Sequence, residues 1–308
     1  MEIMPSPKES NNVHIMGALS RNLIYRGWII ARRDLKDKME HSGPEEITRR
    51  NNVKIFGNGK RTMLFGHGFG CDQNTWRWVT PYFRDDFKIV VFDYVGAGSS
   101  DLKAYQPDRY STLEGYALDI VEICDELGLI NIVFVGHSVS SMIGILAQKL
   151  RPGLFDQMVF IGPSPRYLND DGYHGGIDRE DLEGLLAVME DNYQGWSQLL
   201  APKIMGNLDR PALGEQLTAS FCATDPAIAK EFARVTFLSD NRKDLPSLDI
   251  PSLTIQCQQD FLTSEQVAIY IRQQTPKNQL TMLSSTGHCP HLSDPQGVAN
   301  AIKLFLDR

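Results

Sequence analysis

The sequence IVFVGHSVSSMIGILA, residues 132–147, decides the fold class of this chain. Its first four residues are apolar and predict a buried strand, and the apolar residues from Met142 onward predict a helix. Between them, Gly136-His137-Ser138-Val139-Ser140 predicts a sharp turn that lifts the central serine clear of the backbone. A serine hydroxyl is a weak nucleophile until a neighbouring base takes its proton. The turn therefore predicts a histidine, an acid and an oxyanion site elsewhere in the chain.

On either side of this turn, strands and helices alternate along the chain. Apolar runs predict strands over 53–56, 62–65, 88–92, 132–135, 158–161, 252–256 and 279–283, and helices over 112–127, 140–150 and 296–306. Apolar strands separated by helices favour an α/β fold with a mostly parallel sheet covered on both faces. The first two strands flank Gly57-Asn58-Gly59-Lys60, which predicts a β-hairpin.

The alternation is interrupted between Pro163 and Pro246, where no strand is predicted. Helical segments are predicted at about 178–191, 194–206, 211–222 and 225–238. We expect residues 163–246 to form a helical lid over the edge of the sheet. The α/β core would then consist of residues 46–162 and 247–308.

Residues 1–45 differ from the rest of the chain, because they are rich in Arg and Lys and show little strand character. We expect an N-terminal extension that is partly helical or disordered. The alternative is an amphipathic helix over 21–40 that binds a partner or a membrane surface.

Composition excludes several classes of function. The net charge is -7 and no basic stripe is present, which argues against nucleic acid as a partner. Five scattered cysteines without a CxxC pair favour a reducing cytoplasm over a disulfide framework. No run approaches the roughly 20 apolar residues that span a bilayer. We therefore expect a cytoplasmic protein without a transmembrane segment.

Ser138 is the predicted nucleophile, and His288 is the predicted base. His288 follows the last predicted strand on a loop with glycine before it and proline after it, so it can reach the sheet edge. His291 is the local rival, and we expect it to face the following helix. Cys289 could pass for a nucleophile, but a small apolar filler beside the site is the favoured interpretation.

Asp260 is the predicted acid of the site. It comes just after the strand over 252–256 and its short tail, and it gives the chain order Ser, Asp, His. Its carboxylate would hold the imidazole in one tautomer. Asp93 also ends a strand, but it precedes Ser138 in the chain, so we expect a structural role for it.

The amides of Phe69 and Val139 are the predicted oxyanion hole. Phe69 lies in His67-Gly68-Phe69-Gly70 after an early strand, and Val139 follows the nucleophile. Aromatic residues of the predicted lid would form a pocket for a small, largely apolar ligand, with Trp196 and Phe237 on its wall. The sequence shows no metal-ligand cluster and no GxGxxG, and this chemistry requires no cofactor.

These segments resemble those of the α/β-hydrolases, over about residues 47–308. More narrowly they resemble the RsbQ-like group of bacterial sigma-B regulators, which is related to the plant strigolactone and karrikin receptors. The stretches that carry the resemblance are 66–73, 92–96, 136–140, 161–167 and 287–293. Residues 164–168 and 191–196 favour the bacterial branch.

The resemblance implies an eight-stranded sheet with a four-helix lid inserted after the sixth strand. It also implies a Ser138-Asp260-His288 triad below a closed hydrophobic cavity, and a role in stress signalling with a PAS-domain phosphatase.

Three functions are compatible with these observations. The first is a serine hydrolase that cleaves a small hydrophobic ester or lactone and serves stress or small-molecule signalling. The second is a ligand-binding signalling regulator, acting with a PAS-domain phosphatase, in which hydrolysis is slow or incidental. The third is a cofactor-free perhydrolase or a carbon–carbon bond hydrolase on the same fold.

Overall fold

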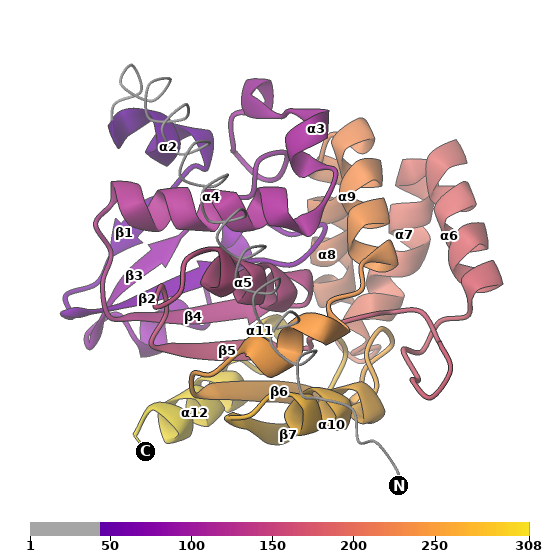
Figure 1. Cartoon of the computed structure of the whole chain (residues 1–308). Helices are drawn as coiled ribbons and strands as arrows, with labels where there is room; N and C mark the ends of the chain where they lie inside the picture. Colours follow the sequence, from indigo (N-terminus) through magenta and orange to yellow (C-terminus); the bar gives the residue numbers. More distant parts are fainter. Residues whose placement is uncertain (1–43, 308) are drawn as a thin grey trace, which may run out of the picture. The chain divides into compact units, whose positions relative to one another are not determined.

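A computed structural model describes residues 44–307, and the unit that begins at Ile47 is built on a seven-stranded sheet (Figure 1). The strands follow the order β1-β3-β2-β4-β5-β6-β7 across the sheet. Their bounds are β1 (Lys54–Phe56), β2 (Arg61–Gly66), β3 (Phe87–Val91), β4 (Ile132–His137), β5 (Gln157–Ile161), β6 (Ser252–Gln259) and β7 (Asn278–Thr286). Only β1 pairs antiparallel within this described sheet; the other five neighbouring pairs are parallel. The prediction of a mostly parallel α/β sheet is confirmed.

The predicted hairpin over the first two strands is wrong. β1 pairs with β3, in the register Lys54 with Val91, and β2 lies on the other side of β3. The linker crosses the start of β3, where the amide of Asn58 donates to the carbonyl of Arg84 at 3.0 Å. A Cβ on Gly59 would lie 1.9 Å from the carbonyl oxygen of Asp86, so the glycines permit this crossing rather than a tight turn.

The strand count implied by the resemblance also needs correction. Residues 44–307 contain seven strands in the sheet instead of eight, and the helical insertion follows β5, not a sixth strand. The seven apolar runs visible in the sequence correspond to the seven observed strands. The eighth strand came from the resemblance alone.

Successive residues of each central strand point to opposite faces of the sheet. Ile132 and Phe134 face one core cluster, whereas Val133 and Val135 face the other. The first cluster is covered by α4 (Leu113–Glu126), α5 (Val139–Leu150) and α10 (Glu265–Gln274). The second is covered by α12 (Pro295–Leu306) and by the segment that carries η1 (Gln73–Trp76) and η2 (Thr80–Tyr82). Both faces are therefore buried, which explains why the strands are apolar throughout.

The described residues also form several short helices. They are α2 (Pro44–Arg50), η3 (Leu102–Ala104), α3 (Pro107–Tyr110), η4 (Arg242–Ser247) and α11 (Pro290–Ser293). A buried carboxylate joins two of them to α4: Asp119 accepts from Arg109 at 2.6 Å and lies 3.3 Å from Arg50. The two guanidinium groups compensate the burial of Asp119, which would otherwise be costly.

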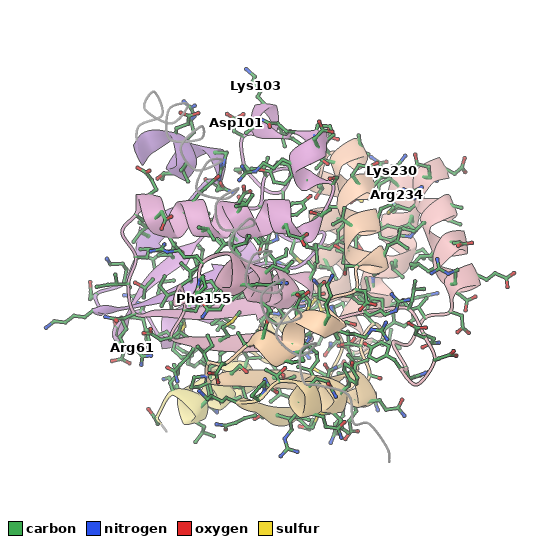
Figure 2. The ribbon with its side chains drawn as sticks, in the orientation of Figure 1. Arg61, Asp101, Lys103, Phe155, Lys230 and Arg234 are labelled. Carbon is green, nitrogen blue, oxygen red and sulfur yellow. The ribbon has the colours of Figure 1, made fainter. Side chains whose placement is uncertain are left out.

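The four helices predicted between β5 and β6 are confirmed. They are α6 (Arg179–Asp191), α7 (Tyr193–Met205), α8 (Pro211–Ala223) and α9 (Pro226–Leu238). Asp225 caps α9 by accepting from the amides of Ala227 and Ile228, as its position before Pro226 predicted. Lys230 and Arg234 are labelled on α9 in Figure 2, and the Lys230 ammonium donates to the carbonyl of Glu190 at 2.6 Å, which joins α9 to α6.

The predicted N-terminal extension, with its possible helix over 21–40, lies outside the described residues apart from the start of α2. Within residues 44–307, no helix is both long enough and apolar enough to cross a bilayer.

Candidate active site

The turn from β4 to α5 holds Ser138 in a strained conformation. Its φ is 55° and its ψ is -124°, in a region that non-glycine residues rarely adopt. The amide of Ser138 donates to the carbonyl of Ile161 on β5 at 2.8 Å, which fixes the turn on the sheet. A Cβ on Gly136 would lie 2.8 Å from the backbone of Ser140, so only glycine fits there. The sharp turn predicted from the sequence is present.

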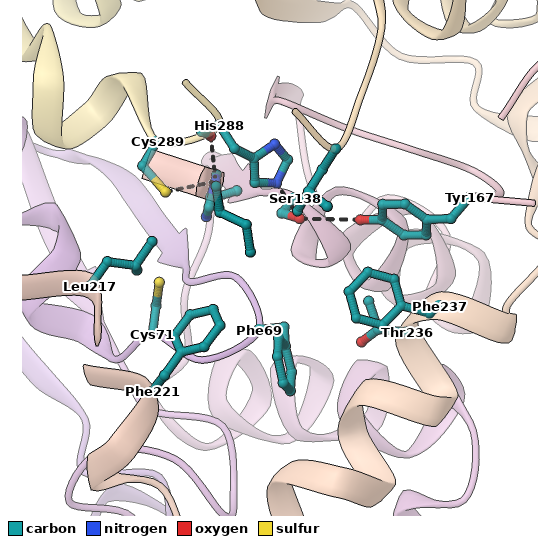
Figure 3. A pocket seen from close by; sticks show the side chains of 13 residues that line it. Phe69, Cys71, Ser138, Tyr167, Leu217, Phe221, Thr236, Phe237, His288 and Cys289 are labelled. Carbon is teal, nitrogen blue, oxygen red and sulfur yellow. Dashed lines mark hydrogen bonds between the residues drawn. The ribbon is translucent and has the colours of Figure 1, made fainter. Parts of the chain in front are cut away.

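The structure brings Ser138, His288 and Asp260 together from three separate parts of the chain. Ser138 Oγ lies 2.8 Å from His288 Nε2, and His288 Nδ1 lies 2.9 Å from Asp260 Oδ2 (Figure 3 shows the first pair). Burial by itself would raise the pKa of Asp260, but the attraction of His288 and several hydrogen bonds outweigh it and lower that pKa. Asp260 is therefore ionised, and the proton of the neutral imidazole lies on Nδ1.

Asp260 is held by four donors besides His288. The amides of Leu262 and Thr263 donate to Oδ1 at 2.8 and 3.2 Å, and the Thr263 hydroxyl donates to Oδ2 at 2.8 Å. The amide group of Gln256, which is fully buried on β6, donates to Oδ2 at 3.1 Å. The sequence analysis did not identify Gln256 or Thr263. Their positions four residues before and three residues after Asp260 were the available signal.

The loop that carries His288 is fastened to the helical insertion. Gly287 has a φ of 94°, and a Cβ there would lie 1.9 Å from the carbonyl oxygen of Met205. The amide of His288 donates to the carbonyl of Ile204, near the end of α7, at 2.9 Å. The His137 ring donates to the carbonyl of His288 at 2.9 Å. Glycine is required before His288 because the loop passes directly against α7.

His291 lies behind the site, whereas Cys289 is buried in the lining of the cavity. The His291 ring packs on Trp76 at 4.8 Å, and its Nε2 lies 2.7 Å from the Thr75 hydroxyl. Burial, with smaller effects of His288 and Arg77, lowers the pKa of His291 to about 3. Burial also raises the pKa of the Cys289 thiol well above its usual value, which disfavours the reactive thiolate.

A metal ion has one candidate cluster among residues 44–307. Ligand atoms of His137, Cys289 and His291 lie within 4.8 Å of one another. His137 Nε2 is already bonded to the His288 carbonyl and His291 Nε2 to Thr75, so these two nitrogens hold the loops together. We interpret the cluster as structural.

Asp93, the other acid that ends a strand, lies in a purely structural network. It accepts from the amides of Gln73 and Ser99 at 2.8 and 2.9 Å and from the Asn52 side chain at 2.7 Å. These bonds fix the loops that follow β2 and β3.

The amides of Phe69 and Val139 have no acceptor among the described residues. Val139 is the first residue of α5, so its N–H is one of the free donors at that helix N-terminus. Within residues 44–307 both amides are therefore free donors, and Phe69 belongs to the lining of the cavity at Ser138. Ser140, which replaces the glycine of the general motif, donates to the carbonyl of His67 at 2.5 Å and lies 2.8 Å from the Tyr94 hydroxyl. It therefore ties the turn to the loop that carries Phe69.

An apolar cavity lies beside Ser138 (Figure 3). Its wall includes Phe69, Leu217, Phe221 and Phe237, and Cys71 and Cys289 lie beside them. About 20 Å³ is open to the centre of a water molecule, which is room for little more than one water.

The structure treats the two predicted pocket residues differently. Phe237 lines the cavity. Trp196 lies one layer behind the wall, stacked on Phe221 with ring centroids 6.0 Å apart. The prediction that Trp196 lies on the cavity wall rested on its being an aromatic residue of the inserted helices, which does not show that Phe221 lies in front of it.

Tyr167 is a site residue that sequence reasoning missed. Its hydroxyl lies 3.2 Å from Ser138 Oγ, and its side chain lines the cavity. The sequence signal was its position shortly after β5, where the chain leaves the carboxyl edge of the sheet. That position alone does not show which way a tyrosine points.

Comparison with known proteins agrees with this architecture. Residues 63–301 match the model of the alpha/beta hydrolase family. A karrikin insensitive 2 receptor from Petunia hybrida is 40% identical, over 80% of this chain and 92% of the relative. A strigolactone esterase from Arabidopsis thaliana is 38% identical, over 83% of this chain and 96% of the relative.

A solved structure, a hydrolase from Oleispira antarctica, has a TM-score of 0.84 and 42% identity. The match covers 86% of this chain and 98% of that one. The chain therefore belongs to the α/β hydrolase family, as an esterase-type enzyme closely related to a plant karrikin insensitive 2 receptor and a plant strigolactone esterase.

Proposed function

We propose that this protein is a serine hydrolase that cleaves a small hydrophobic ester or lactone and serves small-molecule or stress signalling. The observation that carries the proposal is the continuous hydrogen-bond path from Ser138 through His288 to Asp260, at 2.8 and 2.9 Å, on the floor of an apolar cavity. A path of this kind is what converts a serine hydroxyl into a nucleophile at neutral pH.

In this mechanism Ser138 Oγ attacks the substrate carbonyl and its proton passes to His288 Nε2. Ionised Asp260 stabilises the imidazolium that forms. The amides of Phe69 and Val139 donate to the negative oxygen of the tetrahedral intermediate, and each such donor is typically worth about 3 kcal/mol of the barrier. His288 then protonates the leaving oxygen. In the second step, water attacks the acyl-enzyme with His288 again as the base, and the acyl group leaves Ser138.

The decisive test is the Ser138→Ala variant with an activated aryl ester such as p-nitrophenyl acetate. We expect at least a thousandfold loss of turnover, since the variant retains only binding and the oxyanion donors. A fluorophosphonate probe should label the wild type and leave the variant unlabelled.

Ser247→Ala is the matched control, because the Ser247 hydroxyl donates to the Asp244 carbonyl at 2.6 Å, outside the cavity. Unchanged turnover in Ser138→Ala would refute the mechanism.

A second candidate is a ligand-binding signalling regulator with slow hydrolysis, acting with a PAS-domain phosphatase. The small free volume of the cavity fits slow hydrolysis, because a substrate could enter only if the helical insertion, which we propose to be a lid over residues 163–246, moved. Karrikins and strigolactones are the first ligands to test, since the plant relatives carry those names.

Two measurements separate the candidates. Turnover of a strigolactone above about one per minute would favour the hydrolase. Ligand-dependent binding of a PAS-domain phosphatase from the same cell, retained by Ser138→Ala, would favour the regulator.

A further inference from the structure

The hydroxyl of Tyr167 contacts the predicted nucleophile directly, and the mechanism above does not use it. It lies 3.2 Å from Ser138 Oγ, and Figure 3 shows the two groups facing each other on the side of Ser138 away from Cys289. The side chain is 1% exposed. Its ring packs edge-on against Phe237 at 5.1 Å, so it is held in place without its hydroxyl. A hydroxyl so fixed is a candidate for chemistry rather than for packing.

The direction of this hydrogen bond follows from the protons available. Both oxygens of Asp260 lie within 3.1 Å of His288 Nδ1, so that nitrogen carries the proton of the neutral ring. Nε2 is then an acceptor, and the Ser138 hydroxyl uses its single proton to donate a hydrogen bond to it at 2.8 Å. Ser138 has no second proton to give. Tyr167 is therefore the donor and Ser138 Oγ the acceptor.

We propose that Tyr167 is a further catalytic residue, which donates a hydrogen bond to Ser138 Oγ when that oxygen leaves the acyl-enzyme. The inference rests on the proposed function, since it requires Ser138 to be the nucleophile. In deacylation, water adds to the acyl carbon and its proton passes to His288 Nε2. The bond from that carbon to Oγ then breaks, its electron pair goes to Oγ, and Oγ takes the proton back from His288. Tyr167 keeps its own proton throughout and stabilises the negative charge on Oγ.

The same hydrogen bond has the opposite effect on the first step. In the resting enzyme it draws electron density from Oγ and so opposes attack on the substrate. In the acyl-enzyme it favours departure of Oγ. Loss of the hydroxyl should therefore slow deacylation without slowing acylation. A purely structural role would instead slow both steps.

The test is Tyr167→Phe, which removes one oxygen and leaves the ring packed on Phe237. With p-nitrophenyl acetate in stopped flow, we expect deacylation to slow about tenfold, the effect of one hydrogen bond to a charged oxygen. We expect the acylation rate to be equal or higher. The acetyl-enzyme should then accumulate, seen as a larger burst of nitrophenol and as one added acetyl group in the mass of the protein.

Tyr173→Phe is the matched control, because the Tyr173 hydroxyl donates to the carbonyl of Arg166 at 2.8 Å and does not line the cavity. It should behave as the wild type. As a second variant, 3,5-difluorotyrosine at position 167 keeps the shape and strengthens the donor, so deacylation should be faster than in Tyr167→Phe by at least the same factor.

Equal deacylation rates in the wild type and Tyr167→Phe, or a parallel slowing of both steps, would overturn the proposal. Failure of the proposed function looks different, because then no acetyl adduct would form on Ser138 in any of these proteins.

Discussion

At the scale of single residues, the site depends on groups that stay neutral although they are titratable. His67, His137 and His291 are all fully buried near Ser138, and in each case burial is the main cause of a lowered pKa. These rings hold backbone carbonyls and hydroxyls in place as neutral groups. Protonating them would place uncompensated charge beneath the cavity.

This arrangement predicts a loss of stability in acid. His291 titrates at about 3 in the folded protein and near 6.5 when unfolded, so the unfolded state alone binds a proton between these values. Stability should therefore be complete above pH 6.5 and fall as the pH decreases toward 3, by at most about 1.4 kcal/mol per pH unit for each such histidine. Urea unfolding from pH 4.5 to 7 measures this slope.

His291→Gln should reduce the slope, since an amide can bond to Thr75 but does not titrate. His174→Gln is the control, because His174 is exposed. A slope unchanged in His291→Gln would show that the stability does not depend on this ring.

At the scale of elements, the contact between α7 and the loop after β7 controls the position of His288. Gly287→Ala would place a methyl group 1.9 Å from the carbonyl oxygen of Met205, in addition to the cost of a φ of 94°. We expect ester turnover to fall more than tenfold, because displacement of the base by about 1 Å costs rate steeply. Steady-state kinetics and melting temperature measure the two effects.

Gly153→Ala is the matched control for Gly287→Ala. Gly153 has a φ of 79°, but a Cβ there would meet nothing within 4 Å. It carries the conformational cost without the collision, so it should lower stability and leave turnover unchanged. Equal turnover in the two variants would contradict the role assigned to this contact.

Ion pairs connect the two ends of the helical insertion. Arg242 donates to Asp240 at 2.7 Å and to Asp170 at 2.8 Å, and Arg166 donates to Asp240 at 3.1 Å. Arg242→Ala should therefore speed hydrogen–deuterium exchange over residues 166–178 and leave the strands of the sheet unchanged.

High salt should raise the exchange rate of the wild type over residues 166–178 toward that of Arg242→Ala, because salt screens exposed ion pairs. Lys277→Ala, which removes an exposed pair with Asp249, should not alter exchange in the insertion. Unchanged exchange over 166–178 in Arg242→Ala would show that other contacts hold these ends.

At the scale of the whole molecule, the sequence predicts those features of the fold that depend on local residue patterns. The buried strands, the four inserted helices and the order of Ser138, Asp260 and His288 follow from periodicity and from the logic of the motif. Pairing between distant segments does not follow. β1 pairs with β3 because the linker, through its two glycines, passes close to the backbone at Asp86, and no local signal for a turn reveals that approach.

The same limit explains the site residues that were missed. Tyr167 lies 29 residues from Ser138 in the chain, so their proximity exists only after the sheet and the insertion have packed. Gln256 and Thr263 lie within four residues of Asp260, but the sequence does not show that their side chains turn toward its carboxylate. Trp196 shows the converse: its burial was predictable, but the side chain between it and the cavity was not.

The hydrogen bond from the backbone of His288 to the carbonyl of Ile204 has a consequence for timing. If the inserted helices move away from the cavity to admit a ligand, the last turn of α7 must break its hydrogen bond with the backbone of His288. The protein would then be inactive in its open form and active only after closure. Ligand entry and bond cleavage would therefore be mutually exclusive in time.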